Sequence, residues 1–561
     1  MRTHTLLNSV EMRFLSMLLG GMLLLHYTLG CAVQPSPETV RELRAVDIND
    51  PMHQELRSSP IIDVHTHMFN ARYLPLRGIA LGKRDKLLFT HLISDKLAIG
   101  LTNAIVKKTP FLQPIGISDH ESETDPIDRI LQQSALECGI PYEEFSKEPA
   151  VRALRKLIEQ CEKGMVEYDP NRDVLTEAEE RALEKLGVVG DPGLITNLRM
   201  DDRDFTELYR RLFGLQNREV YTIRHMMDLG PVYDQCGDTS LAQFTTTQID
   251  RASAFQSQPD SGQLYFVAYN PFRDHWHDCD QETRNPLQVV IDAVEEKQAF
   301  GVKVYPPSGY RPIENDIPDR PFTLFTDEPE RQWDARYSET TNERLDELLG
   351  QLLDECIRRD IPVFAHSHTG EMEARSGYGV HHANPKFWQT FLDSDSPDPC
   401  VERSELRLCF GHAGGNGFWF GTGDHPSWGK LVRDLCMRYP NVYAEVGVHG
   451  HISMASRRAV FVERLLEAVR LHEDQADEYP HSLMSKIMYG SDWYMPPGSS
   501  ARDYLEGFEQ AFLHPGLREY YSRFFYGNAV RFLNLARQVD RPELDPVARE
   551  RVKKILNNLA P

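Results

Sequence analysis

The sequence predicts an α/β protein, a (β/α)8 TIM barrel with a long helical insertion between the first and second strands. Two observations lead to this fold class. Short apolar runs that end in a polar residue recur through the chain, and such runs are typical of buried parallel strands whose carboxyl ends open on a site. In the second half of the chain these runs alternate with helical patterns, as strands and helices do in parallel α/β folds.

The expected strands follow one another in chain order. They occupy residues 60–64, 220–224, 265–269, 301–305, 362–366, 407–411, 442–446 and 486–490. The clearest helix between them carries leucines at helical spacing from Leu345 to Leu353, before Pro362 starts the next strand. At 561 residues the chain could hold several average domains, but a barrel with insertions reaches this size as one. We therefore predict a single barrel domain at 60–540 and a C-terminal helical tail at 541–561.

The first two expected strands are separated by an unusually long stretch. It has about 150 residues, whereas ordinary strand-to-helix connections have about 2–6. Its pattern is mostly helical, and Val151, Leu154, Leu157 and Ile158 keep the spacing of one helix face. We predict that residues from about 70 to 218 form an inserted helical cap on the barrel.

Residues 1–31 are expected to be a targeting segment outside the fold. A mostly apolar run at 14–25 is too short to cross a bilayer well and suits the apolar core of a signal peptide. A small residue before Cys31 resembles the bacterial lipoprotein cleavage site, although Thr28 stands where that motif usually has leucine. An uncleaved anchor is the alternative, and both hypotheses tie the folded part to a membrane of the cell envelope, outside the cytoplasm. Residues 32–59 are polar, contain three prolines and are predicted to be a tether.

Composition and charge limit the partners. A hydrophobic content of 41% is enough for a sizeable core. The net charge of −22 argues against nucleic acid, because phosphates require a basic face, so a small-molecule partner is expected. Of nine cysteines, the eight that follow Cys31 show no framework spacing, which leaves disulfides undecided. The oligomeric state is equally open.

Several expected strands end in residues that can bind a metal ion or transfer a proton. His65 and His67 end the first strand, and both rings project to the same side because strand side chains alternate. His366, His412 and Asp492 follow later strands. Since the carboxyl ends of parallel strands meet at one barrel face, these residues are expected to surround one point. Imidazole nitrogens with a carboxylate oxygen suit zinc or a similar divalent ion.

The chain resembles the amidohydrolase superfamily from residue 60 to about residue 535. Within it, the chain is similar to the amidohydrolase-related group that includes aminocarboxymuconate-semialdehyde decarboxylase and several lactonases. Six motifs in the family's order carry the resemblance: Asp-x-His-x-His at 63–67, Pro-Val-x-x-His at 362–366, Leu-x-x-Gly-His-Ala-Gly-Gly at 408–415, Asn-Val-Tyr-Ala at 441–444, Gly-Ser-Asp-Trp at 490–493 and Gly-Asn-Ala-x-Arg at 527–531. The helical insertion and the tether are not part of the match.

The resemblance implies that His65, His67, His366 and Asp492 bind the metal and that His412 is the acid–base or substrate-polarising residue. A divalent ion lowers the pKa of bound water to about 7, and Asp492 could both bind that ion and accept the proton. We expect a metal-dependent hydrolase with one zinc ion, acting on a C–O or C–N bond of a small carbonyl substrate. A non-oxidative decarboxylase is one alternative, because the group contains both activities. A catalytically inactive barrel used as a binding module is another.

Other polar residues near the strand ends have two interpretations each. Lys303 lies on the fourth strand, where some amidohydrolases carry a carboxylated lysine that bridges two ions, but the resemblance to the single-metal group favours one ion. His368 could replace His366 as a ligand, although the Pro-Val-x-x-His spacing favours His366. Arg311 could pair with a substrate carboxylate or lie at the surface. A solvated loop at the barrel rim is preferred for His275, His277 and Cys279. A substrate contact is considered for His449 and His451.

Overall fold

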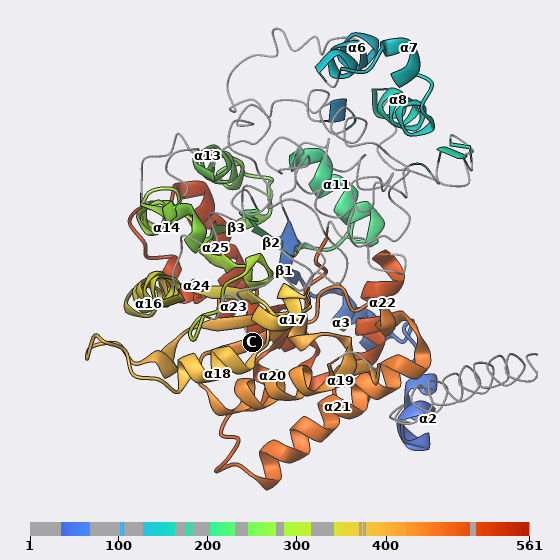
Figure 1. Cartoon of the computed structure of the whole chain (residues 1–561). Helices are drawn as coiled ribbons and strands as arrows, with labels where there is room; N and C mark the ends of the chain where they lie inside the picture. Colours follow the sequence, from blue (N-terminus) through green and yellow to red (C-terminus); the bar gives the residue numbers. More distant parts are fainter. Residues whose placement is uncertain are drawn as a thin grey trace, which may run out of the picture.

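The computed structural model shows eight parallel strands that form one sheet in the order β1 to β8 (Figure 1). Their bounds are β1 Ile61–His67, β2 Val220–His225, β3 Gln263–Tyr269, β4 Gly301–Val304, β5 Val363–His366, β6 Leu408–Gly411, β7 Val442–Glu445 and β8 Ile487–Met488. Each lies where the sequence predicts a strand, so the (β/α)8 fold is confirmed. The structure describes residues 35–67, 101, 104–105, 127–137, 139–162, 175–176, 178–179, 182, 202–229, 245–275, 285–315, 342–369, 373, 377–422, 425–493 and 501–559.

The barrel has a seam between β8 and β1. Parallel ladders join every pair of consecutive strands from β1 to β8. Separate bonds join the last strand to the first: the Val64 amide donates to the Tyr489 carbonyl at 3.2 Å, and the His67 amide donates to the Trp493 carbonyl at 2.7 Å. Thr66 and Trp493 also form an isolated bridge. The sheet thus closes into a barrel through single contacts beside the ends of β1 and β8.

Helices surround the strands on the outside. They include α13 Thr245–Gln256, α14 Pro286–Glu295, α16 Asn342–Arg359, α20 Pro426–Arg438, α21 Ala455–Asp474 and α22 Ala501–Phe512. In α16, Leu345 and Leu352 are buried because helical spacing places them on one face. Helix α14 begins with proline, and Asn285 caps it by accepting a hydrogen bond from the Leu287 amide at 2.8 Å.

The amino-terminal half of the barrel interior is apolar. Ile62, Phe266, Phe364 and Met488 belong to a buried cluster with residues of three C-terminal helices: α23 Asn528–Phe532, α24 Leu535–Gln538 and α25 Pro546–Asn557. Several of these strand residues precede a candidate site residue on the same strand. The C-terminal helices therefore close one end of the barrel and leave the site to the other. Helix α25 lies within the predicted helical tail.

The connection from β1 to β2 contains the helices of the predicted insertion. They are α6 Ile127–Glu137, α7 Tyr142–Phe145, α8 Pro149–Glu162 and α11 Asp202–Leu212. Val151, Leu154, Leu157 and Ile158 of α8 are buried, as their spacing predicts. Figure 1 shows α6, α7 and α8 away from the strands, whereas α11 lies close to β1.

The predicted tether contains two helices that bind to the barrel. They are α2 Pro37–Ala45 and α3 Pro51–Ser58, and their first residues are two of the prolines that suggested a linker. Proline favours the first turn of a helix, and Ser36 and Asp50 supply the caps. Arg57 Nε bonds Glu509 Oε2 at 2.7 Å, which attaches α3 to α22. The predicted targeting segment at 1–31 lies outside the described residues. In the part that the structure describes, every helix is too short or too polar to cross a membrane.

Candidate metal centre

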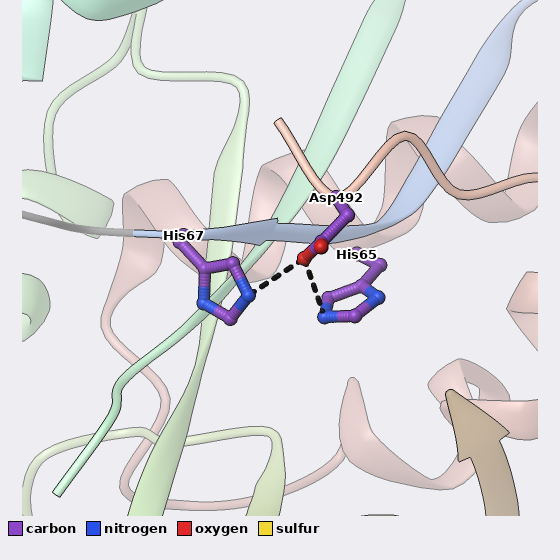
Figure 2. A group of neighbouring side chains, drawn as sticks. All are labelled: His65, His67 and Asp492. Atoms are coloured by element: carbon purple, nitrogen blue, oxygen red, sulfur yellow. Dashed lines mark ion pairs between the residues drawn. The ribbon is translucent and has the colours of Figure 1, made fainter. Parts of the chain in front are cut away.

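Two histidines of β1 and an aspartate after β8 meet inside the carboxyl end of the barrel. Asp492 Oδ1 lies 3.0 Å from His65 Nε2 and 2.7 Å from His67 Nε2 (Figure 2). All three side chains are buried, and their ligand atoms are close enough to hold one metal ion. The structure therefore brings together these three predicted residues.

Hydrogen bonds on the far side of each ring determine where the protons lie. His65 Nδ1 is 2.6 Å from Glu445 Oε1, and His67 Nδ1 is 3.2 Å from the His225 carbonyl oxygen. Carbonyl and carboxylate oxygens accept, so each Nδ1 carries the proton. Asp492 Oδ1 has no hydrogen-bond partner among the described residues, so each Nε2 faces it with a lone pair. Burial and the charge of Lys303 hold the pKa of His65 well below its usual value, which keeps the ring neutral.

This arrangement of lone pairs fits a cation. Two imidazole lone pairs that face one carboxylate oxygen at 2.7 and 3.0 Å repel it unless positive charge lies among them. Two nitrogens and one oxygen are a donor set that zinc accepts. The residues present thus fit the metal that the sequence predicts.

The ends of β5 and β6 bring a second pair of histidines together. His412 Nδ1 lies 3.2 Å from the Gly447 carbonyl oxygen, and its Nε2 lies 3.1 Å from His366 Nδ1. The carbonyl must accept, so His412 Nε2 accepts in turn from His366 Nδ1–H, and His366 Nε2 keeps its lone pair. That nitrogen is buried and has no hydrogen-bond partner among the described residues, which is the state that a metal ligand needs. The His412 and His65 ring centroids are 4.9 Å apart.

Glu445, at the end of β7, is a site residue to which the sequence analysis gave no role. Its Oε1 accepts from His65 Nδ1–H at 2.6 Å and from the His412 amide at 2.7 Å, so one carboxylate joins the two histidine groups. It is completely buried. The available signal was an acidic residue inside an expected buried strand, since a buried carboxylate requires partners. His225 is a similar case: it follows the predicted second strand, and its ring centroid lies 5.0 Å from that of His65.

The backbone at His412 and Asp492 is held in an unfavourable conformation. Their φ angles are 62° and 56°, in the left-handed region that non-glycine residues rarely adopt. Such a conformation costs about 1–3 kcal/mol and persists only where the surroundings impose it. The Asp492 amide donates to the His65 carbonyl at 2.7 Å, and the His412 amide donates to Glu445. These bonds, and not local preference, direct both side chains into the barrel.

Lys303 of β4 lies within the same group. Its Nζ is 3.2 Å from His65 Nε2 and 4.3 Å from the centroid of the Phe364 ring. Burial lowers the pKa of Lys303 to about 8, and burial raises the pKa of Glu445 to about 8. The amine therefore reaches one of the lone pairs that face Asp492.

The remaining candidates occupy different places. The His368 ring centroid lies 5.8 Å from that of His412, so His368 adjoins the histidine pair. His449 is buried, with Nδ1 2.9 Å from Asn416 Oδ1. Arg311 is buried and not a surface residue, and its guanidinium lies 4.1 Å from the centroid of the Phe387 ring. His275 ends the 3-10 helix η5 Pro271–His275, the His451 ring centroid lies 6.0 Å from that of Phe420, and His277 and Cys279 lie outside the described residues.

Fold and site define a class of protein, a (β/α)8 barrel with a histidine–aspartate centre at the carboxyl ends of its strands. Residues 291–535, less than half of the chain, match the model of the amidohydrolase family (Amidohydro_2). The region contains β4 to β8 with His366, His412 and Asp492, whereas His65 and His67 precede it.

Comparisons with other proteins give distant likenesses. No curated protein matches the chain. A probable 2-pyrone-4,6-dicarboxylic acid hydrolase from Acinetobacter baumannii is 8% identical and covers 59% of this chain and 89% of its own, with a TM-score of 0.32. A putative hydrolase of the same name from Pseudomonas putida is 12% identical, with coverages of 58% and 86% and a TM-score of 0.30. The 5-carboxyvanillate decarboxylase of Sphingomonas paucimobilis is 11% identical, with coverages of 62% and 87% and a TM-score of 0.29. These values are too low to bear on the activity of this chain.

Proposed function

We propose that this chain is a metal-dependent hydrolase that acts on a C–O or C–N bond of a small carbonyl substrate. One observation carries the proposal: the lone pairs of His65 Nε2 and His67 Nε2 converge on Asp492 Oδ1. The family match supports it, because amidohydrolases include hydrolases as well as decarboxylases.

One zinc ion would be held by His65, His67, His366 and Asp492. His366 is included because its Nε2 is buried without a hydrogen-bond partner among the described residues. When bound, such an ion polarises a carbonyl group and lowers the pKa of bound water to about 7.

Asp492 and His412 would transfer protons. Burial alone would raise the pKa of Asp492, but the histidines and Lys303 around it lower it overall, so the carboxylate is ionised and can accept a proton from water. Burial lowers the pKa of His412 to about 3, which keeps the ring neutral. Because its Nδ1–H is directed at Gly447, His412 enters the reaction as an acceptor at Nε2. It must receive a proton before it can protonate a leaving group.

The test combines metal content with product analysis. The protein would be purified without added metal, analysed for zinc, and assayed on a panel of lactones and amides with and without a carboxylate. About one zinc per chain, lost in His65→Ala but kept in the control His472→Ala, together with hydrolysis, supports the proposal. Release of CO2 without hydrolysis would identify a decarboxylase instead. Absence of both metal and turnover would leave a binding module.

We also propose that the N-terminal segment ties the protein to a membrane of the cell envelope. The support is the apolar run at 14–25 and the cleavage-like site at Cys31, both outside the described residues. Cys31→Ala should block lipid attachment and should release the protein from membranes or leave an unprocessed precursor. Fractionation and mass spectrometry measure this, and a variant processed and located like the wild type would refute the lipoprotein hypothesis.

A further inference from the structure

We infer that the helical insertion takes part in holding the metal centre, through Tyr209 of α11 as a positioning residue. Tyr209 acts on the centre through Asp63 and Trp493. The inference rests on the proposed function, because it concerns the same centre.

Asp63 joins the two chain segments that carry predicted ligands. One of its oxygens, Oδ1, accepts from the His65 amide at 3.1 Å and from the Ser491 amide at 3.0 Å. His65 is a predicted ligand, and Ser491 immediately precedes Asp492. A single carboxylate oxygen therefore fixes the backbone of β1 relative to the segment after β8. This is the seam of the barrel, where continuous pairing of strands is replaced by single contacts.

Tyr209 supplies the partner of the other oxygen of Asp63. Its hydroxyl donates to Asp63 Oδ2 at 2.7 Å, and both side chains are buried. A carboxylate inside protein is costly unless each oxygen is bonded. The side chains that hydrogen-bond Asp63 are those of Tyr209 and Ser491, so removing the tyrosine hydroxyl takes away the bond at Oδ2 and one of these two donors. The orientation of Asp63 thus depends on a residue of the insertion.

The same helix supports the seam through aromatic packing. The Tyr209 ring stacks on Phe213 with centroids 4.5 Å apart, and both rings pack edge-on against Trp493 at 6.2 and 5.7 Å. Trp493 follows Asp492, and its carbonyl accepts from the His67 amide at 2.7 Å. Helix α11 therefore contacts the backbone on both sides of the predicted ligand set.

Contacts of this kind have a measurable effect on metal affinity. Groups that orient metal ligands without touching the metal typically contribute about 10–100-fold to affinity. Tyr209 is one hydrogen bond further from the ligands, so we expect Tyr209→Phe to weaken zinc binding by about 10-fold, the lower end of this range, measured by competition with a chromophoric chelator. The matched control is Tyr526→Phe, which also removes a buried hydroxyl, one that donates to the Ile555 carbonyl at 2.7 Å among the C-terminal helices. The control should keep its zinc affinity, and an affinity of Tyr209→Phe within about threefold of the wild type would overturn the inference.

A second measurement uses the unchanged chain, in case the variant does not fold. Coupling between two sites is reciprocal, so if α11 strengthens zinc binding, zinc must stabilise the packing of α11. Hydrogen exchange with and without zinc should show slower exchange of amides in α11 on loading, while α8 serves as an internal reference and does not change. Equal exchange of α11 in both states would contradict the inference. A wild type that binds no zinc would instead refute the proposed function and remove the inference with it.

Discussion

The two halves of the barrel interior are built from the same strands but filled with opposite chemistry. Ile62, Phe364 and Met488 make the amino-terminal half apolar, whereas imidazoles, carboxylates and Lys303 occupy the carboxyl-terminal half. Both halves contain fully buried side chains, since Phe364 and Glu445 are each 0% exposed. An apolar half stabilises the fold through burial alone, but a buried polar half is stable only while each group keeps its partner. Stability and chemistry should therefore be separable by mutation.

The largest effect is expected at the polar end. Asp492→Ala removes the carboxylate on which His65 and His67 converge, so both metal binding and turnover should be lost. Zinc analysis and the hydrolysis assay measure this loss. Full turnover in the variant would contradict the assignment of the centre.

The apolar end should show the opposite behaviour. Leu533 is completely buried in the cluster between the strands and the C-terminal helices. Leu533→Ala should lower the free energy of unfolding by about 2–5 kcal/mol, because it leaves a cavity, and should not change zinc affinity. Urea unfolding and chelator competition test the two parts. A large loss of affinity would show that the two halves are not independent.

Glu445 tests how far the polar half depends on each partner. In Glu445→Gln the side-chain oxygen can stay at the Oε1 position and accept from both His65 Nδ1–H and the His412 amide, but the NH2 group then faces the Gly447 amide, which donates to Oε2 in the wild type, so one accepting contact becomes a clash of donors. We expect zinc affinity to fall by about 10–100-fold with the fold retained. The half-exposed Glu467 provides a control in Glu467→Gln, whose affinity should equal that of the wild type. Unchanged affinity in Glu445→Gln would mean that this carboxylate only fills space.

The pH dependence of stability should also arise in the polar half. Burial lowers the pKa of His65 and His366 well below 6.5, and that of His412 to about 3, so the unfolded chain binds more protons below about pH 6.5 and stability is lost as the pH falls. Burial raises the pKa of Asp63 to about 6 and that of Glu445 to about 8, so ionisation of these groups destabilises the fold as the pH rises. The metal-free protein should be most stable near pH 6.5, the usual pKa of histidine. Urea unfolding from pH 4 to 8 measures this, and a decline above pH 6.5 that persists unchanged in Glu445→Gln would contradict the account.

The smallest effect concerns the number of ions. If the centre holds one ion and Lys303 is unmodified, Lys303→Met should keep about one zinc per chain. Lys486→Met is the matched control, because burial lowers the pKa of Lys486 to about 8 as well. About two metals per wild-type chain, with one lost in Lys303→Met, would instead establish a bridging lysine.

Much of the fold could be predicted because strand and helix periods are local properties of the sequence. The ends of the strands were less predictable. The first strand extends beyond residue 64 to His67, past an irregularity in its pairing with β2. The last strand is shorter than predicted and covers Ile487–Met488 at the seam. Residues 32–59 show a further limit. Proline indicates both a linker and a first helical turn, and only contacts with α22 distinguish the two.

The candidate site could be predicted where its residues lie at the carboxyl ends of the expected parallel strands. His65, His67 and Asp492 meet in one group that could hold a metal, and His366 lies beside His412. Glu445 and Tyr209 escaped because their roles depend on partners far away in the chain: Glu445 bonds a histidine 380 positions distant, and Tyr209 bonds an aspartate 146 positions distant. No local pattern records such pairings.

The seam also makes the barrel mechanically unequal around its circumference. Elsewhere consecutive strands share continuous ladders, but closure depends on a few bonds such as that from the Val64 amide to the Tyr489 carbonyl. A fluctuation that opens the barrel would begin at this weakest point, and it would separate His67 from Asp492 while the other ladders stay intact. Under mild denaturant the protein should therefore lose bound metal, and the proposed activity with it, before it loses secondary structure, so inactivation would precede global unfolding.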